Sequence, residues 1–147
     1  QGKLIILPTG DGMALVFFNS VHAAFKCAVD VGKKTYKHPQ IGLRNGVYSG
    51  PVVPVKDINN NPNVSGSGIN MAQRCMDAGD NDHILISNGV HQYVNQMDIP
   101  GLKFEDWGPV IVKHGSTVHM WTAYGSNFGR TEFPHWRGTK KAEFKTE

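Results

Sequence analysis

The chain has few of the features that mark secreted or membrane proteins. Only two of its 147 residues are cysteines, Cys27 and Cys75. Both lie in segments with helical spacing, so we expect no disulfide framework and a reducing compartment. No apolar run approaches the roughly 18 residues of a membrane span, and no signal peptide is visible. These absences predict a cytoplasmic protein with no membrane segment.

Charge is also sparse. Charged residues make up 18% of the chain, and the formal net charge is +3. No dense run of Lys or Arg precedes the tail, so the sequence does not predict a nucleic-acid partner. The hydrophobic content of 39% is ordinary for a globular protein, and 147 residues are enough for one domain with a substantial core.

Predicted strands and helices alternate along the chain. The apolar residues of 19–39 recur at helical spacing, and Asn19 or Ser20 can cap that helix. Shorter helices are predicted within 69–81 and 88–97. The predicted strands lie within 3–9, 13–18, 41–55 (broken at Gly50-Pro51), 83–87 and 102–124 (with turns at Gly108-Pro109 and His114–Ser116). A polar, turn-rich loop or arm separates two of them, and the alternation predicts an α/β or α+β fold with a mixed sheet.

The segment 13–18, MALVFF, is almost continuously apolar. Such a run is typical of a strand that is covered on both faces, so we predict that it is central and buried. Asp11 stands just before it, between two glycines. Asp-Gly is common in tight hairpin turns, so Asp11 can be a simple turn former. It can equally be a carboxylate that binds a metal from the tip of a hairpin.

Three further polar residues have two interpretations each. Asn70 and Arg74 are four residues apart in a predicted helix, which places them on one face. That face can be an ordinary solvent-exposed one, as for most Asn and Arg residues. Lys113 lies beside a predicted turn, where a solvated lysine is common. The residues alone leave these alternatives open.

Four stretches in chain order resemble the catalytic domain of the class III nucleotidyl cyclases, the adenylyl and guanylyl cyclases. They are TGDGMALVF (9–17), LRNGVYSGPVV (43–53), NVSGSGINMAQRCMDAGDNDHILIS (63–87) and VIVKHG (110–115). Together they cover most of the chain, from Ile5 to Tyr124. The alternative is a different ferredoxin-like domain with a coincidental GDG hairpin, which does not explain the later stretches.

The resemblance implies an α+β fold with a ferredoxin-like core (βαββαβ), in which a mixed or antiparallel sheet is flanked by helices. It implies a catalytic domain over 1–125 that lacks the family's N-terminal strand, followed by a tail or arm over 126–147. The implied reaction joins the 3′-oxygen of a nucleoside triphosphate to its own α-phosphorus and releases pyrophosphate. Two divalent ions, Mg²⁺ or Mn²⁺, assist it at the interface of a head-to-tail homodimer.

The resemblance also implies residue roles. Asp11 matches the second of two metal-binding carboxylates. Asn70 matches the residue that orients the ribose, and Arg74 matches the one that stabilises charge on the α-phosphate. Lys113 matches the lysine that binds the terminal phosphates.

The sequence departs from the family pattern in two places. The first metal carboxylate belongs to a segment before the GDG hairpin, and this chain begins too late to contain it. Leu7 and Asn63, with Val64 next, replace the charged pair that reads adenine, so these substrate-binding positions predict a non-standard base preference. ATP read differently, GTP or a pyrimidine triphosphate (giving cyclic UMP or CMP) all remain open. The alternative function is an inactive cyclase-homology domain used for dimerisation or regulation.

Overall fold

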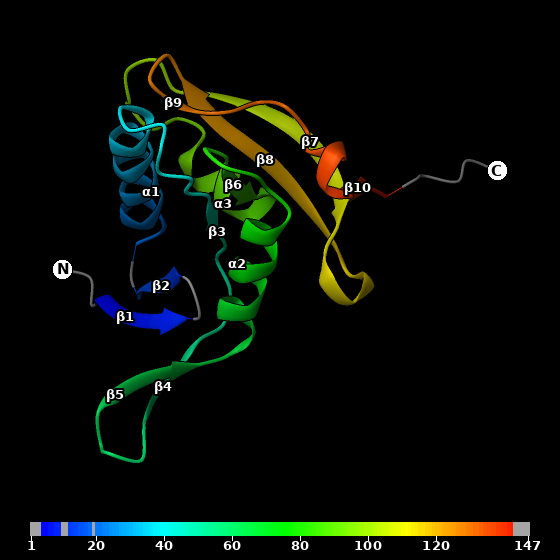
Figure 1. Cartoon of the computed structure of the whole chain (residues 1–147). Coiled ribbons are helices and arrows are strands. Elements are labelled where there is room, and N and C mark those ends of the chain that lie inside the picture. The colour runs from blue at the N-terminus through cyan, green and yellow to red at the C-terminus, as the bar shows by residue number, and fades with distance from the viewer. Residues whose placement is uncertain (1–3, 10–11, 19, 143–147) are drawn as a thin grey trace.

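A computed structural model describes residues 4–9, 12–18 and 20–142 of the chain. Three α-helices flank a mixed sheet, and two separate hairpins lie beside it (Figure 1). The helices are α1 (Val21–Tyr36), α2 (Ser67–Asp77) and α3 (Asn88–Val94). The strands are β1 (Leu4–Thr9), β2 (Gly12–Phe17), β3 (Asn45–Val47), β4 (Val53–Lys56), β5 (Pro62–Ser65), β6 (Ile84–Ser87), β7 (Lys103–Ile111), β8 (Thr117–Gly125), β9 (Phe128–Gly129) and β10 (Lys140–Lys141). The predicted α+β fold with a mixed sheet flanked by helices is confirmed.

The main sheet has the order β10-β7-β8-β6-β3, and β9 also pairs with β8. The pairing of β3 with β6 is parallel, whereas β6, β7 and β9 all pair with β8 in antiparallel fashion. The long strands β7 and β8 form a hairpin closed by the 3-10 helix η1 (Lys113–Gly115). The tip of this hairpin therefore carries Lys113 away from the sheet.

Helices cover both faces of the sheet. On one face, α1 and α3 pack against Ile84 and Ile86 of β6, with Phe25 among the fully buried side chains. On the other face, α2 packs through Cys75 against Leu85 and Trp107. Successive residues of β6 thus point into different cores, which is why all four of its residues are buried. The predicted short buried strand at 83–87 is confirmed.

Serine side chains cap two of the helices. Ser20 Oγ accepts a hydrogen bond of 3.0 Å from the Ala23 amide, and Ser87 Oγ accepts one of 3.3 Å from the Val90 amide. The cap predicted at Asn19 or Ser20 is therefore made by Ser20. None of the described helices is long and apolar enough to span a bilayer.

The prediction that 13–18 forms a central strand buried on both faces is wrong. Strand β2 pairs with β1 in a two-stranded sheet, separate from the main one among the described residues. Only Val16 of β2 is buried, together with Ile5 of β1, while Met13 is 64% exposed. A continuous apolar run gives no information on which strands will pair with it, and here one face of the hairpin faces solvent.

Two further predictions differ in detail. Residues 108–109 do not form a turn, because β7 continues through them with a shift in register between Asp106 and Gly108. Gly108 adopts a φ of 70°, which is compatible with a β-bulge, so the strand continues and the chain does not reverse direction. The polar arm predicted at 56–68 contains a strand, β5, which pairs with β4 in a hairpin that projects from the body (Figure 1).

The segment after β8 contributes to the core. Phe128 in β9 is fully buried and packs with Phe25 and Ile84 between α1 and the sheet. The division predicted between residues 125 and 126 is not tested by this packing and stays a prediction. Further along, the 3-10 helix η2 (His135–Arg137) precedes β10, which pairs with β7.

Replacing Phe128 with alanine is expected to lower the free energy of unfolding by about 3–5 kcal/mol, because a large buried ring is lost and leaves a cavity. Urea denaturation followed by circular dichroism measures this. The matched control is Ile58→Ala, since Ile58 is 98% exposed and its loss is expected to change stability by less than about 0.5 kcal/mol. Equal midpoints for the two variants would contradict the placement of Phe128.

Candidate functional site

Close backbone packing fixes the position of α2. A Cβ on Gly46 would lie 2.5 Å from the Met76 amide nitrogen, so β3 approaches the helix as only glycine allows. At the start of the helix, Gly66 has a φ of 136° and the Gly68 amide donates to the Pro51 carbonyl at 3.0 Å. The backbone that leads into α2 therefore has little conformational freedom, and the helix is held at a fixed position relative to the sheet.

A depression of about 350 Å³ lies at the C-terminal end of α2. It brings together Arg74 from α2 and Lys113 from the tip of the β7–β8 hairpin, two residues 39 positions apart that the sequence assigns to one substrate. The remaining residues around it are Asp77, Ala78, Ile111, Val112, Arg137, Gly138 and Thr139. The structure thus gathers two of the predicted site residues at one place.

The charges around this depression are unbalanced. Its carboxylate, Asp77, lies 3.5 Å from the Arg44 guanidinium and accepts a hydrogen bond from Gln73 at 3.1 Å. By contrast, the described part of the chain places no carboxylate oxygen within 4.0 Å of Arg74, Lys113 or Arg137. Among the described residues, the polar contact of the Arg74 side chain is one of 3.5 Å from Nη1 to the Met71 sulfur. Three cations without carboxylate partners are suited to bind a multiply charged anion.

The other end of α2 borders an apolar cluster. Val64 of β5 is buried with Ile5 and Val16, and Leu7 and Ile69 pack against them. Asn63, half-buried, accepts a hydrogen bond of 2.8 Å from the Val64 amide through Oδ1. Leu7 and Val64 therefore share one cluster, and burial in that cluster is a sufficient structural role for Val64.

Asn70 lies between these two ends. It is exposed and precedes Arg74 by one helical turn, but it does not line the depression that contains Arg74 and Lys113. Its position on the same helix agrees with the spacing expected from the sequence. Its role stays a prediction.

The predicted metal ligand, Asp11, lies outside the described residues. Within 4–9, 12–18 and 20–142, no group of three or more His, Cys, Asp or Glu side chains is arranged to hold a metal. A metal site that includes Asp11 stays a prediction.

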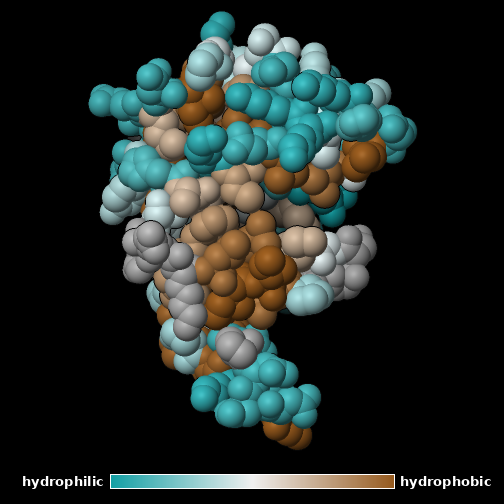
Figure 2. Space-filling view, turned by 90° about the vertical axis from the view of Figure 1, so that its left-hand side faces the viewer, coloured by the Kyte–Doolittle hydropathy of each residue, from teal (hydrophilic) through white to brown (hydrophobic). Residues whose placement is uncertain are grey.

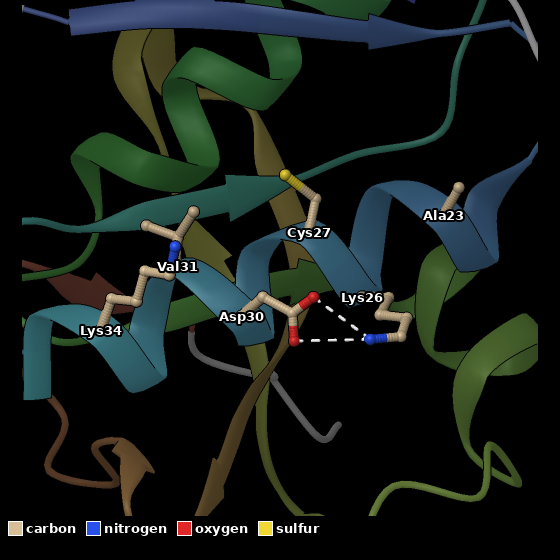
Figure 3. A pocket seen from close by; sticks show the side chains of 6 residues that line it. All are labelled: Ala23, Lys26, Cys27, Asp30, Val31 and Lys34. Carbon is tan, nitrogen blue, oxygen red and sulfur yellow. Dashed lines mark hydrogen bonds and ion pairs between the residues drawn. The ribbon is translucent and has the colours of Figure 1, made fainter.

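Two other features do not qualify as reactive sites. Burial raises the pKa of the Cys75 thiol to about 12, so this side chain stays neutral and acts as a small apolar core residue. A depression of about 380 Å³ on α1 is lined by residues of that helix alone, including an ion pair of 3.2 Å between Lys26 and Asp30 (Figure 3). Because all of these residues come from one helix face, the depression does not combine side chains from different elements, and we do not assign it a function.

Sequence reasoning did not single out Arg137. It lies in 126–147, which has no clear apolar period and was expected to form a tail or arm. The only signal available was a lone basic residue between aromatic and glycine neighbours, which is too common to be informative. Its place beside Arg74 and Lys113 depends on the pairing of β10 with β7.

Comparisons with known proteins give a consistent answer. No protein-family model matches the chain. The chain is 34% identical over 131 residues to a protein of Rhizobium meliloti (strain 1021) named "Putative adenylate cyclase 3". This match covers 83% of the chain but 21% of the relative, so the chain spans about a fifth of the length of that protein.

Two solved structures share the fold. An adenylate/guanylate cyclase/hydrolase from Silicibacter pomeroyi matches with a TM-score of 0.66 and 25% identity, over 82% of this chain and 72% of that one. The adenylyl cyclase CyaB from P. aeruginosa matches with a TM-score of 0.51 and 18% identity, over 86% and 75%. The second likeness concerns the fold alone.

Proposed function

Because this chain resembles class III nucleotidyl cyclases in sequence and in fold, we propose that it converts a nucleoside triphosphate to a 3′,5′-cyclic nucleotide and pyrophosphate. The observation that carries the proposal is the meeting of Arg74 and Lys113 at one depression. Both lack a carboxylate partner among the described residues, so both can bind the triphosphate.

In this proposal two residues of α2 and one residue at the tip of the β7–β8 hairpin bind different parts of the nucleotide. Arg74 stabilises the negative charge that develops as the leaving pyrophosphate separates from the α-phosphate. Lys113 neutralises the terminal phosphates, and Asn70 orients the ribose. A fixed helix suits this purpose, since catalysis of phosphoryl transfer depends mainly on positioning and charge stabilisation.

Divalent ions enter the proposal through Asp11. We propose that two ions, Mg²⁺ or Mn²⁺, are required and that Asp11 is one of their carboxylate ligands. This role is inferred from the sequence motif alone.

We further propose that the active sites form in a head-to-tail homodimer. Asp11 of one protomer would act with Asn70 and Arg74 of its partner. The outer face of the β1–β2 hairpin supports this, because Leu4, Ile6, Met13 and Leu15 are 47%, 57%, 64% and 36% exposed. Figure 2 shows apolar atoms gathered over one area between α1 and the β4–β5 arm. Contiguous apolar surface of this kind is typical of an interface.

The base preference is proposed to be non-standard. Leu7 offers no hydrogen bond, and Asn63 offers a neutral amide where a charged group is usual. A pyrimidine triphosphate, giving cyclic UMP or CMP, is one candidate. The second candidate function is a cyclase-homology domain without activity, used for dimerisation or regulation. The departure from the family pattern at Leu7 favours it.

Restoring the charged pair with Leu7→Lys and Asn63→Asp is expected to shift product formation toward cyclic AMP, relative to the other bases, by roughly tenfold or more. The reason is that a hydrogen bond to a charged group contributes about 1.5–3 kcal/mol. The measurement is the ratio of cyclic products formed from an equimolar mixture of ATP, GTP, CTP and UTP.

The matched control for this pair is Gln92→Lys. Gln92 is exposed on α3, away from the predicted base position and from the proposed interface on the β1–β2 hairpin. The substitution introduces the same positive charge as Leu7→Lys without reaching the predicted base position. An unchanged product ratio in the double variant, with the control also unchanged, would show that Leu7 and Asn63 do not read the base.

A further inference from the structure

Residues 130–142 form a strap that ties the C-terminal end of α2 to β7. At its start, the Glu132 carbonyl accepts from Nε2 of buried His83 at 2.8 Å, and the Thr131 carbonyl accepts from the Trp107 indole at 3.3 Å. At its end, β10 pairs with β7, and the Ala142 amide donates to the Pro109 carbonyl at 2.9 Å. The strap therefore joins the two elements that carry Arg74 and Lys113.

The middle of the strap closes over the end of the helix. Thr139 Oγ1 donates to the Ala78 carbonyl at 3.0 Å, and Arg137 Nη1 donates to the Gly79 carbonyl. The Trp136 indole donates to Asp80 Oδ2 at 2.7 Å and is the main reason that the pKa of that carboxyl is lowered. These contacts leave Arg137 beside the depression that Arg74 and Lys113 line.

We propose that Arg137, presented by this strap, is a third phosphate-binding residue of the site and binds the pyrophosphate end of the nucleotide. The inference rests on the proposed function, because it names a further residue for the same substrate. None of the sequence motifs described above includes this residue.

The donor capacity of Arg137 carries the inference. A guanidinium has five N–H donors, and the described residues supply one acceptor to it, the Gly79 carbonyl. Asp80 accepts from Trp136, lies 3.9 Å from Arg130 and also feels the charge of Arg137, but it is not within 4.0 Å of the Arg137 guanidinium, and Asp77 pairs with Arg44. The remaining donors are thus available to an anion, for which the planar guanidinium is well suited.

The size of the depression agrees with this ligand. At about 350 Å³ it lies near the lower end of the roughly 300–1,000 Å³ typical of small-molecule pockets. It suits the phosphate chain of a nucleotide better than a whole nucleotide. The competing explanation is that Arg137 only caps the negative end of the α2 dipole through Gly79.

Three variants separate binding from capping. Arg137→Gln keeps a polar side chain with N–H donors but removes the charge, whereas Arg137→Lys keeps the charge. Lys140→Ala is the matched control, because Lys140 is an exposed cation on the same strap that does not line the depression. Affinity for inorganic pyrophosphate is measured by titration calorimetry at two salt concentrations, and folding is checked by thermal denaturation.

We expect Arg137→Gln to weaken pyrophosphate binding roughly tenfold or more and to reduce its salt dependence, with Arg137→Lys closer to the wild type and Lys140→Ala unchanged. Wild-type affinity in Arg137→Gln, or no pyrophosphate binding by the wild-type protein, would overturn the assignment. Failure of the proposed function is seen separately. If the proposed function is wrong, the wild-type protein forms no cyclic product. If product is formed but the KM of Arg137→Gln is unchanged, the inference about Arg137 alone is rejected.

Discussion

Replacing Arg74 with alanine is expected to lower the turnover number for cyclic-nucleotide formation by roughly 10²–10³-fold, with a smaller change in KM. The expected size is that of removing one preorganised group that stabilises transition-state charge. Arg74 lines the depression without a carboxylate partner among the described residues, so its charge is available to the substrate. Steady-state kinetics with the preferred nucleotide measures the effect.

The control for this variant is Gln73→Ala. Gln73 is the preceding residue of α2, is exposed, and makes its hydrogen bond within the helix surface to Asp77. We expect its turnover to stay within about twofold of the wild type, because surface changes of this kind alter free energies by less than about 0.5 kcal/mol. Equal turnover in Arg74→Ala and Gln73→Ala would remove Arg74 from the reaction.

Replacing Asp11 with asparagine is expected to abolish turnover that depends on Mn²⁺ or Mg²⁺. Asparagine keeps the preference for a turn, but it lacks the charge that hard divalent cations select. The unfolding midpoint should therefore stay near that of the wild type while activity is lost. Turnover at the wild-type level at saturating Mn²⁺ would leave Asp11 as a turn former only.

Mixing the Asp11→Asn and Arg74→Ala chains tests the dimer arrangement. In a head-to-tail homodimer, each mixed dimer would contain one site with both residues intact. Random exchange would then restore up to about a quarter of wild-type activity, since half of the dimers are mixed and each has one of its two sites intact. Native mass spectrometry verifies the mixed dimers, and no recovery in them would exclude a composite site.

Local patterns predicted those features of the fold that depend on neighbouring residues. Ser20 was one of two expected caps for α1, and its hydroxyl is correctly placed to accept from the Ala23 amide. The apolar segment HILIS predicted a buried strand. In a strand, successive side chains point to opposite faces, so the residues of β6 are buried in two cores. In these cases the physical requirement acts within a few residues, so the sequence expresses it directly.

Features that depend on tertiary pairing could not be predicted in this way. The apolar run of β2 predicted a central strand. Burial of its second face would require another layer packed over it, and among the described residues Met13 and Leu15 on that face stay exposed. The pair Gly108-Pro109 is typical of a turn, yet its neighbours continue to pair with β8 across a bulge. In both cases the local sequence gave no information on which strands pair with the segment or which elements pack over it.

The candidate site shows the same division. Asn70 and Arg74 share a helix, so their spacing was informative without a structure. Lys113 was assigned only by resemblance, and its approach to Arg74 depends on the β7–β8 hairpin lying beside the end of α2. The position of Arg137 depends on the strap that follows β9 and adds β10 to the edge of the sheet, and no local sequence pattern marked it.

The central claim is that this protein cyclises a nucleoside triphosphate. The most direct test is incubation of the purified protein with Mn²⁺ and each of ATP, GTP, CTP and UTP, followed by mass spectrometry of the products. The account predicts a 3′,5′-cyclic nucleotide and an equal amount of pyrophosphate from at least one of the four. The Arg74→Ala variant should form both products roughly 10²–10³-fold more slowly. No cyclic product from any of the four, with a folded and dimeric protein, would contradict it.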